Sequence, residues 1–166
     1  MKKLSVKKYT FFSVIILLGI GIDQITKLLA VKFLKPIDTL PIIEDVIHLT
    51  YVENRGAAFG MLSDSRWVFM VVSSIAIVAM LAFLYSGMAQ NRLYEISVAM
   101  IISGGIGNMI DRTALGYVVD MIDFRIIDFA VFNGADSFVC VGAGLLILAL
   151  VLDIIKESKL KKEKKK

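Results

Sequence analysis

Apolar residues form long stretches along this chain, and most polar residues are grouped between them. A membrane-crossing helix needs about 20 mostly apolar residues, and four stretches approach that length, at about residues 11–34, 67–87, 93–110 and 137–152. The second stretch contains no charge, whereas Asp23 and Lys27 interrupt the first and Glu95 lies near the start of the third. The pattern predicts an all-α membrane protein with four transmembrane helices.

The two longer connections, at about residues 35–66 and 111–136, have a different pattern. Residues 46–53 combine β-branched and aromatic side chains with partial alternation, which indicates a short strand. Residues 116–132 are similarly rich in β-branched and aromatic side chains. Because lipid cannot satisfy open backbone groups, we expect a small β-containing extracytoplasmic region on the membrane surface.

The composition agrees with a membrane protein. Hydrophobic residues make up 57% of the 166 residues and the mean hydropathy is +0.76, too apolar for one soluble domain of this size. The stretch at residues 11–22 has the length of a signal-peptide core, but no small-residue cleavage site follows it. We therefore expect a single integral-membrane domain over residues 1–166, with an uncleaved first span.

Lysine and arginine residues predict the orientation. With the N-terminus inside, twelve of them fall on cytoplasmic segments and five on the opposite side, a bias that places both termini in the cytoplasm. The lysine-rich C-terminus, from Lys156 to Lys166, is interpreted as a topology anchor attracted to anionic lipid. No basic face interleaves with aromatic residues, so nucleic acid is not an expected partner.

This orientation brings the polar residues of the spans to one side of the membrane. Asp23 and Lys27 lie one helical turn apart, which predicts an ion pair that offsets two charges in lipid. At the other end of the membrane, Glu95 and Asp153 are interpreted as routine flanking charges. The residues expected near the outer leaflet are Asp23, Lys27, Asn54, Asn108, Arg112, Asp120, Asn133 and Asp136.

Of the hydrolytic chemistries, two aspartates that share one proton fit best. Zinc is not expected, because the chain has one histidine, His48, and one cysteine, Cys140, and lacks an HExxH motif. No nucleophile motif supports a serine or cysteine mechanism, although a Ser–Lys dyad that uses Lys27 stays conceivable. In an aspartate dyad, one carboxylate activates water while its protonated partner hydrogen-bonds the scissile carbonyl. No cofactor is required.

The polar residues lie in blocks that resemble the signature blocks of the lipoprotein signal peptidase (signal peptidase II) family. Five blocks occur in the family's order and span most of the chain: Asp23-Gln-x-x-Lys27, Asn54-x-Gly-Ala-Ala-Phe-Gly60, Gly104-Gly-x-x-Gly-Asn-x-x-Asp-Arg112, Val118-Val-Asp120 and Phe132-Asn-x-Ala-Asp136. Each block alone is weak, but five together are highly specific. One departure is Met121, where the family commonly has phenylalanine; the two are similar in size and polarity.

The resemblance implies an aspartic endopeptidase of the bacterial cytoplasmic membrane, with its active site at the outer leaflet. It would remove signal peptides from prolipoproteins, cutting before a cysteine that already carries diacylglycerol. By the same resemblance, Asp120 and Asp136 would be the catalytic dyad. Asn54, Gly56, Asn108, Arg112 and Asn133 would shape the substrate site, and Asp23 and Lys27 would support it. The expected partners are the lipid-modified precursor and membrane phospholipid, and we expect a monomer.

Two other classes compete with a protease. A proton-coupled carrier would also place aspartate and lysine in the membrane, but it should show repeats or polar residues that continue to the cytoplasmic half. The chain has neither. A non-catalytic assembly factor is the third class, and only an activity measurement separates it from an enzyme.

Overall fold

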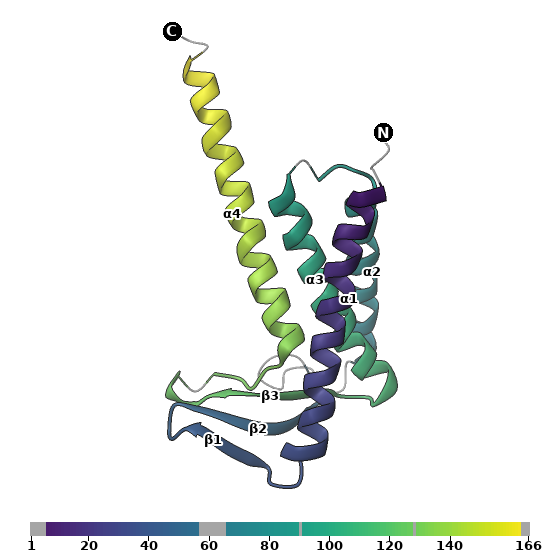
Figure 1. Cartoon of the computed structure of the whole chain (residues 1–166), viewed down its shortest axis with the longest axis vertical. Coiled ribbons are helices and arrows are strands. Elements are labelled where there is room, and N and C mark those ends of the chain that lie inside the picture. Colours follow the sequence, from purple (N-terminus) through teal and green to yellow (C-terminus); the bar gives the residue numbers. More distant parts are fainter. Residues whose placement is uncertain (1–5, 57–65, 90, 128, 164–166) are drawn as a thin grey trace.

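The structure, a computed structural model, describes residues 6–56, 66–89, 91–127 and 129–163. Four α-helices form most of it (Figure 1): α1 Val6–Leu29, α2 Arg66–Tyr85, α3 Arg92–Ala114 and α4 Gly134–Glu163. A π-helical turn, Ala30–Leu34, extends α1. Three helical segments are long and apolar enough to cross a membrane, at Val6–Leu34, Arg92–Ala114 and Gly134–Glu163, whereas the apolar Met70–Tyr85 segment of α2 is shorter.

The third and fourth helices extend beyond the apolar stretches that predicted them. Helix α3 ends at Ala114 instead of near residue 110, and α4 runs from Gly134 to Glu163 instead of from about 137 to 152. Most of the extra residues are polar or charged but are compatible with a helix, so the helices continue past the apolar limit. As a result, Asp111 and Arg112 belong to α3 and not to the connection that follows it.

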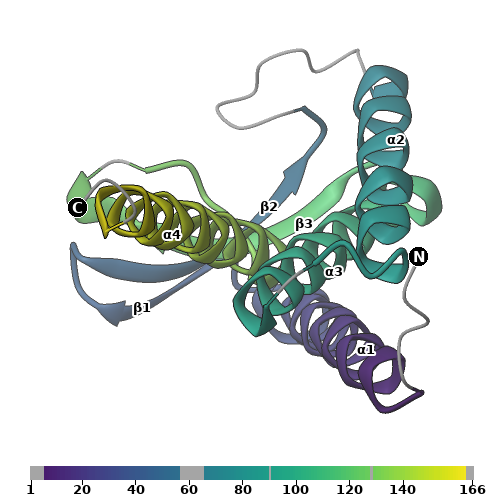
Figure 2. The same cartoon turned by 90° about the horizontal axis from the view of Figure 1, so that it is seen from above.

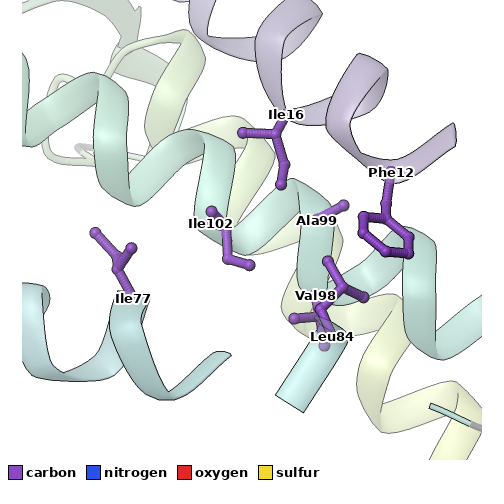
Figure 3. Packing of buried hydrophobic residues seen from close by; sticks show 7 residues of the cluster. All are labelled: Phe12, Ile16, Ile77, Leu84, Val98, Ala99 and Ile102. Atoms are coloured by element: carbon purple, nitrogen blue, oxygen red, sulfur yellow. The ribbon is translucent and has the colours of Figure 1, made fainter. Parts of the chain in front are cut away.

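Helix α3 is the centre of the bundle. It packs against α1, α2 and α4, and the view along the bundle shows the other three around it (Figure 2). Phe12 and Ile16 of α1 and Leu84 of α2 meet on Val98 and Ile102 of α3, and Ile77 and Ala99 complete this cluster (Figure 3). Many outward-facing apolar side chains, such as Leu17, Ile75 and Ile147, are exposed, as expected for helices that face lipid.

Small residues let α4 approach α3 closely. The Cα of Gly104 faces the Ala135 carbonyl oxygen, and that of Gly142 faces the backbone of Ser97 and Ile101. Since lipid is as apolar as the helix surfaces, close packing of this kind drives much of helix association in membranes. The glycines of α3 and α4 therefore set the distance between the two helices.

The sheet lies at one end of the bundle, away from both termini (Figure 1). Its antiparallel strands are ordered β1 Thr39–Ile43, β2 Ile47–Asn54 and β3 Val118–Phe124. Ala30 and Leu34 of the π-helical turn pack on Val119 and Met121 of β3 and fix the sheet to the end of α1. The predicted small β-region is therefore present, and its edge strand β1 was not predicted.

At the opposite end, Lys8 of α1 forms an ion pair with Glu95 of α3. The Glu95 side chain is only 1% exposed, so the interpretation of this residue as a routine flanking charge was wrong. Because Glu95 lies in the first turn of α3 and faces the core, the lysine of α1 provides its counter-charge.

Candidate active site

Asn133 and Asp136 form a reciprocal cap at the start of α4. The Asp136 backbone N–H donates to Asn133 Oδ1 at 3.0 Å, and the Asn133 backbone N–H donates to Asp136 Oδ2 at 3.2 Å. This is the arrangement of a capping box, with a shorter acid in the third position of the helix. The cap fixes where the helix begins and which way the Asp136 carboxylate points.

Asp120 lies on the central part of β3 and is 1% exposed. Two amide nitrogens donate to its carboxylate, Asn54 Nδ2 at 2.9 Å and Asn133 Nδ2 at 2.6 Å. The Asn54 carbonyl in turn accepts the Gly56 backbone N–H at 3.0 Å, so the backbone after β2 determines the orientation of this amide.

Asn108 joins the two aspartates from α3. Its Nδ2 donates to Asp136 Oδ1 at 2.7 Å, and its Oδ1 accepts from Asn133 Nδ2 at 3.1 Å. Since Asn133 Nδ2 also donates to Asp120, a continuous chain of hydrogen bonds runs from Asp120 through two amides to Asp136. Strand β3 and helices α3 and α4 are thereby held together at one point.

The pKa of the Asp120 carboxyl is raised to about 6, chiefly by burial and in addition by the negative charge of Asp136. The hydrogen bonds from Asn54 and Asn133 act in the opposite direction, because they stabilise the ionised form. The result is a carboxyl group that can exchange a proton near neutral pH, as a general acid or base must.

A cavity of about 530 Å³ opens beside the two aspartates. One part of its wall is polar, made by Asn54, Asn108, Arg112, Asp120 and Asp136. The other part is mostly apolar and includes Phe124, Ile127, Phe129, Val131, Phe132 and Cys140. At its polar end, Arg112 Nη2 lies 3.5 Å from the Gly56 carbonyl oxygen. The cavity can thus hold an extended apolar chain against a pair of carboxylates.

Behind the cavity, Lys27 makes three contacts in the interior of the bundle. Its ammonium lies 2.9 Å from Asp23 Oδ2, 3.0 Å from Asp111 Oδ2 and 2.9 Å from Asn108 Oδ1. Asp23 also accepts the Ala135 backbone N–H at 2.8 Å, which ties α1 to the first turn of α4. We call Asp23, Lys27 and Asp111 the buried charge cluster.

The polar side chains that line the cavity are mainly carboxylates and amides. Among the residues that the structure describes, no three His, Cys, Asp or Glu side chains are close enough to hold a metal ion. Cys140 lines the same cavity, but the hydrogen bonds of the described residues include none between its thiol and a base. Two carboxylates in one cavity, one with a pKa near 6, are suited to the activation of water.

A family model described as Signal peptidase (SPase) II matches residues 15–152. The chain belongs to the signal peptidase II family. The lipoprotein signal peptidase of Caldanaerobacter subterraneus subsp. tengcongensis is 50% identical over 133 residues, which cover 80% of this chain and 90% of the relative. That of Clostridioides difficile is 47% identical over 137 residues, which cover 82% and 92%.

Two solved structures of bacterial membrane enzymes share this fold. A chain described as a bacterial membrane enzyme superimposes with a TM-score of 0.82 at 32% identity, and the match covers 92% of this chain and 93% of that chain. A second bacterial membrane enzyme gives a TM-score of 0.78 at 32% identity and covers 90% and 96%. The function of the signal peptidase II family is the removal of signal peptides from prolipoproteins.

The residues predicted from the signal peptidase II resemblance converge in space. Asp120, Asp136, Asn54, Asn108 and Arg112 line one cavity, and Asn133 links the two aspartates. Gly56 contributes backbone atoms at the edge of the site, and the remainder of the Asn54–Gly60 block lies outside the described residues. Asp23 and Lys27 form the ion pair that their spacing predicts. The catalytic roles of these residues stay predictions.

Two residues of the quoted blocks, Asp111 and Gln24, were not predicted as site residues. Asp111 is 4% exposed and receives the Val119 backbone N–H and the Gln24 amide in addition to Lys27. Gln24 Nε2 lies between Asp23 and Asp111 and also donates to the Gly107 carbonyl. The sequence could have indicated Asp111 as a site residue, because it follows Asn108 by three positions and so lies on the same helix face.

Proposed function

We propose that the chain is an aspartic endopeptidase that removes signal peptides from diacylglyceryl-modified prolipoproteins and cuts before the lipidated cysteine. The observation that carries the aspartic mechanism is the hydrogen-bonded path from Asp120 through Asn133 and Asn108 to Asp136 beside one cavity. Membership of the signal peptidase II family supports the prolipoprotein substrate.

In the proposed mechanism Asp136 is the base and Asp120 carries the shared proton. Asp136 removes a proton from water as the water oxygen bonds to the scissile carbonyl carbon. Asp120 gives its proton to the carbonyl oxygen, which forms a tetrahedral diol. Asp136 then passes its proton to the leaving nitrogen as the carbon–nitrogen bond breaks, and a diol proton returns to Asp120. The raised pKa of Asp120 supports its role as the acid.

The residues around the dyad position the substrate. Asn54, Asn108 and Asn133 orient the two carboxylates, and Arg112 with the Gly56 carbonyl borders the polar end of the cavity. The apolar wall would receive side chains of the signal peptide near the cut. Asp23 and Lys27 support the site from behind without lining the cavity.

We further propose four crossings of the bacterial cytoplasmic membrane by one integral domain, with both termini in the cytoplasm and the dyad at the outer leaflet. Both termini lie at the end of the bundle away from the sheet, and the site lies beside the sheet (Figure 1). The positive-inside bias supports a position of the sheet on the outer side of the membrane. The enzyme would act as a monomer in phospholipid and take its substrate sideways from the bilayer.

The topology can be measured with single cysteines in a Cys140→Ala background. Glu44→Cys lies in the turn between β1 and β2, and Glu157→Cys lies on the exposed C-terminal part of α4. A membrane-impermeant thiol reagent added to intact cells should label position 44 and leave position 157 unlabelled until the membrane is opened. Labelling of position 157 alone would invert the proposed orientation.

The dyad is tested with Asp120→Asn and Asp136→Asn. Asparagine retains the shape and much of the hydrogen bonding but cannot exchange a proton, so each variant should cleave no diacylglyceryl-modified precursor while its thermal unfolding stays cooperative. Asp123→Asn is a matched control on the same strand, because Asp123 contacts Thr50 and Arg125 and does not line the cavity. Substantial cleavage by either dyad variant would contradict the mechanism. Cleavage of unmodified precursor by the native enzyme would contradict the substrate class.

A further inference from the structure

The side-chain amides of Asn54, Asn108 and Asn133 have the same orientation relative to the dyad. In each, a hydrogen-bond donor binds the amide oxygen, so the amide nitrogen faces one of the two aspartates. The Gly56 backbone N–H holds the Asn54 carbonyl, and the Asp136 backbone N–H holds the Asn133 carbonyl. For Asn108 this donor is the Lys27 ammonium, 2.9 Å from Oδ1. An ammonium can only donate, so the atom that faces it must be the oxygen, and the nitrogen is left to face Asp136.

We propose that Lys27 is a positioning residue for the cleavage reaction, because it holds the Asn108 amide so that the amide nitrogen donates to the Asp136 carboxylate. This inference rests on the proposed function, in which Asp136 is the base. It gives Lys27 a role in turnover beyond the neutralisation of Asp23 and Asp111. Lys27 is 3% exposed and its ammonium has three acceptors within 3.0 Å, so these contacts fix its position.

The alternative orientation of Asn108 would harm the reaction. If the amide turned over, its oxygen would face the Asp136 carboxylate and its nitrogen would face the Asn133 amide nitrogen, so both contacts would become repulsive. Asn133 Nδ2 also donates to Asn108 Oδ1, at the longer distance of 3.1 Å, and this bond would persist without Lys27. Loss of Lys27 should therefore reduce turnover in part, whereas loss of Asp136 abolishes it.

Lys27 both donates a hydrogen bond to Asn108 and carries a positive charge, so the variants must separate the effects of these two properties. Lys27 pairs with the carboxylates of Asp23 and Asp111, so the native buried charge cluster has a net charge of one negative unit. We therefore use an Asp111→Asn background, in which a neutral residue at position 27 leaves only Asp23 charged and keeps the same net charge. In that background, Lys27→Gln and Lys27→Met have equal charge and similar length, but only glutamine can donate to Asn108. Lys32→Met is the control for loss of an exposed lysine on the same helical segment.

With a diacylglyceryl-modified precursor, we expect Lys27→Met to lower kcat about tenfold to a hundredfold relative to the Asp111→Asn parent, with KM changed by less than about twofold. Lys27→Gln should recover most of the loss. Adding Lys27→Met to Asn108→Leu should cause no further loss, because the two residues act as a unit. Equal kcat for the glutamine and methionine variants, or additive losses with Asn108→Leu, would overturn the proposal.

Asn108→Leu alone keeps the inference testable if the position 27 variants do not fold. It should lower kcat without a matching change in KM, and full kcat in this variant would overturn the role assigned to Lys27. Failure of the proposed function gives a different result, since Asp136→Asn would then remain active. Inactive dyad variants together with a fully active Asn108→Leu would refute only the positioning role.

Discussion

Gly142 and Gly144 of α4 form a matched pair for measuring the effect of helix packing on the site. A methyl group on Gly142 would lie 2.8 Å from the Ser97 carbonyl oxygen and 2.9 Å from Ile101 Cγ1. A methyl group on Gly144 would meet no atom of the described residues within 4 Å. Because both glycines lie in the same helix, their replacement by alanine changes helix propensity alike and differs in the contact with α3.

The expected free energies follow from these two terms. Alanine favours a helix over glycine by about 1 kcal/mol, and at Gly144 this gain should be the whole effect. At Gly142 the methyl would overlap a backbone oxygen, which cannot rotate away as a side chain can, and overpacking costs about 1–3 kcal/mol. The two variants should therefore differ by about 1–3 kcal/mol in the free energy of unfolding.

Thermal unfolding in detergent measures this difference, and Gly142→Ala should unfold about 2–12 °C below Gly144→Ala. Separation of α3 from α4 would also stretch the 2.7 Å hydrogen bond between Asn108 and Asp136, so Gly142→Ala should cleave precursor more slowly while Gly144→Ala keeps native turnover. Equal melting temperatures, or faster turnover by Gly142→Ala, would refute the argument that the glycines set the helix separation.

Two further predictions concern charge. kcat/KM should fall as pH rises through the pKa of Asp120, about 6, because the proposed acid loses its proton. The hydrogen bond from Asn54 lowers the pKa of Asp120, so Asn54→Ala should raise this pKa and move the fall in kcat/KM to higher pH. An unchanged pH profile in Asn54→Ala would contradict the assignment of Asp120 as the acid. Lys27→Met should lower the free energy of unfolding by about 3–5 kcal/mol, because it leaves Asp23 and Asp111 buried without a counter-charge. Asp23→Asn keeps the ion pair between Lys27 and Asp111 and should lower it much less. Thermal unfolding measures both variants, and equal losses would argue against a shared cluster.

The sequence located the elements better than their ends. Apolar length reports the part of a helix that lipid covers, so it identified α1 and α3 but could not show that α4 continues to Glu163. Strand β1 was missed because Pro41 and the short apolar run gave no strand pattern; the strand is an edge strand, where a proline is tolerated. The count of four membrane crossings stays a prediction.

The candidate site was largely predictable because polar groups are costly near lipid and therefore stand out in an apolar sequence. Asp120, Asp136 and Asn108 were identified in this way, and the structure brings them together. Asp111 was not predicted as a site residue, because an acid at a helix end is usually solvated or salt-bridged. Its burial depends on Lys27 from another helix, a contact of residues 84 positions apart that no local pattern contains.

The length of α4 has a practical consequence for experiments on this enzyme. Its 30 residues span about 45 Å, whereas the hydrocarbon of a bilayer is about 30 Å thick. In the proposed orientation, the last turns before Glu163 would stand clear of the lipid and about 40 Å from Asp136. An affinity tag or a fluorophore fused after this helix would therefore be accessible from the cytoplasmic side and far from the reacting groups. Detergent-free immobilisation of the enzyme in nanodiscs could use the same end.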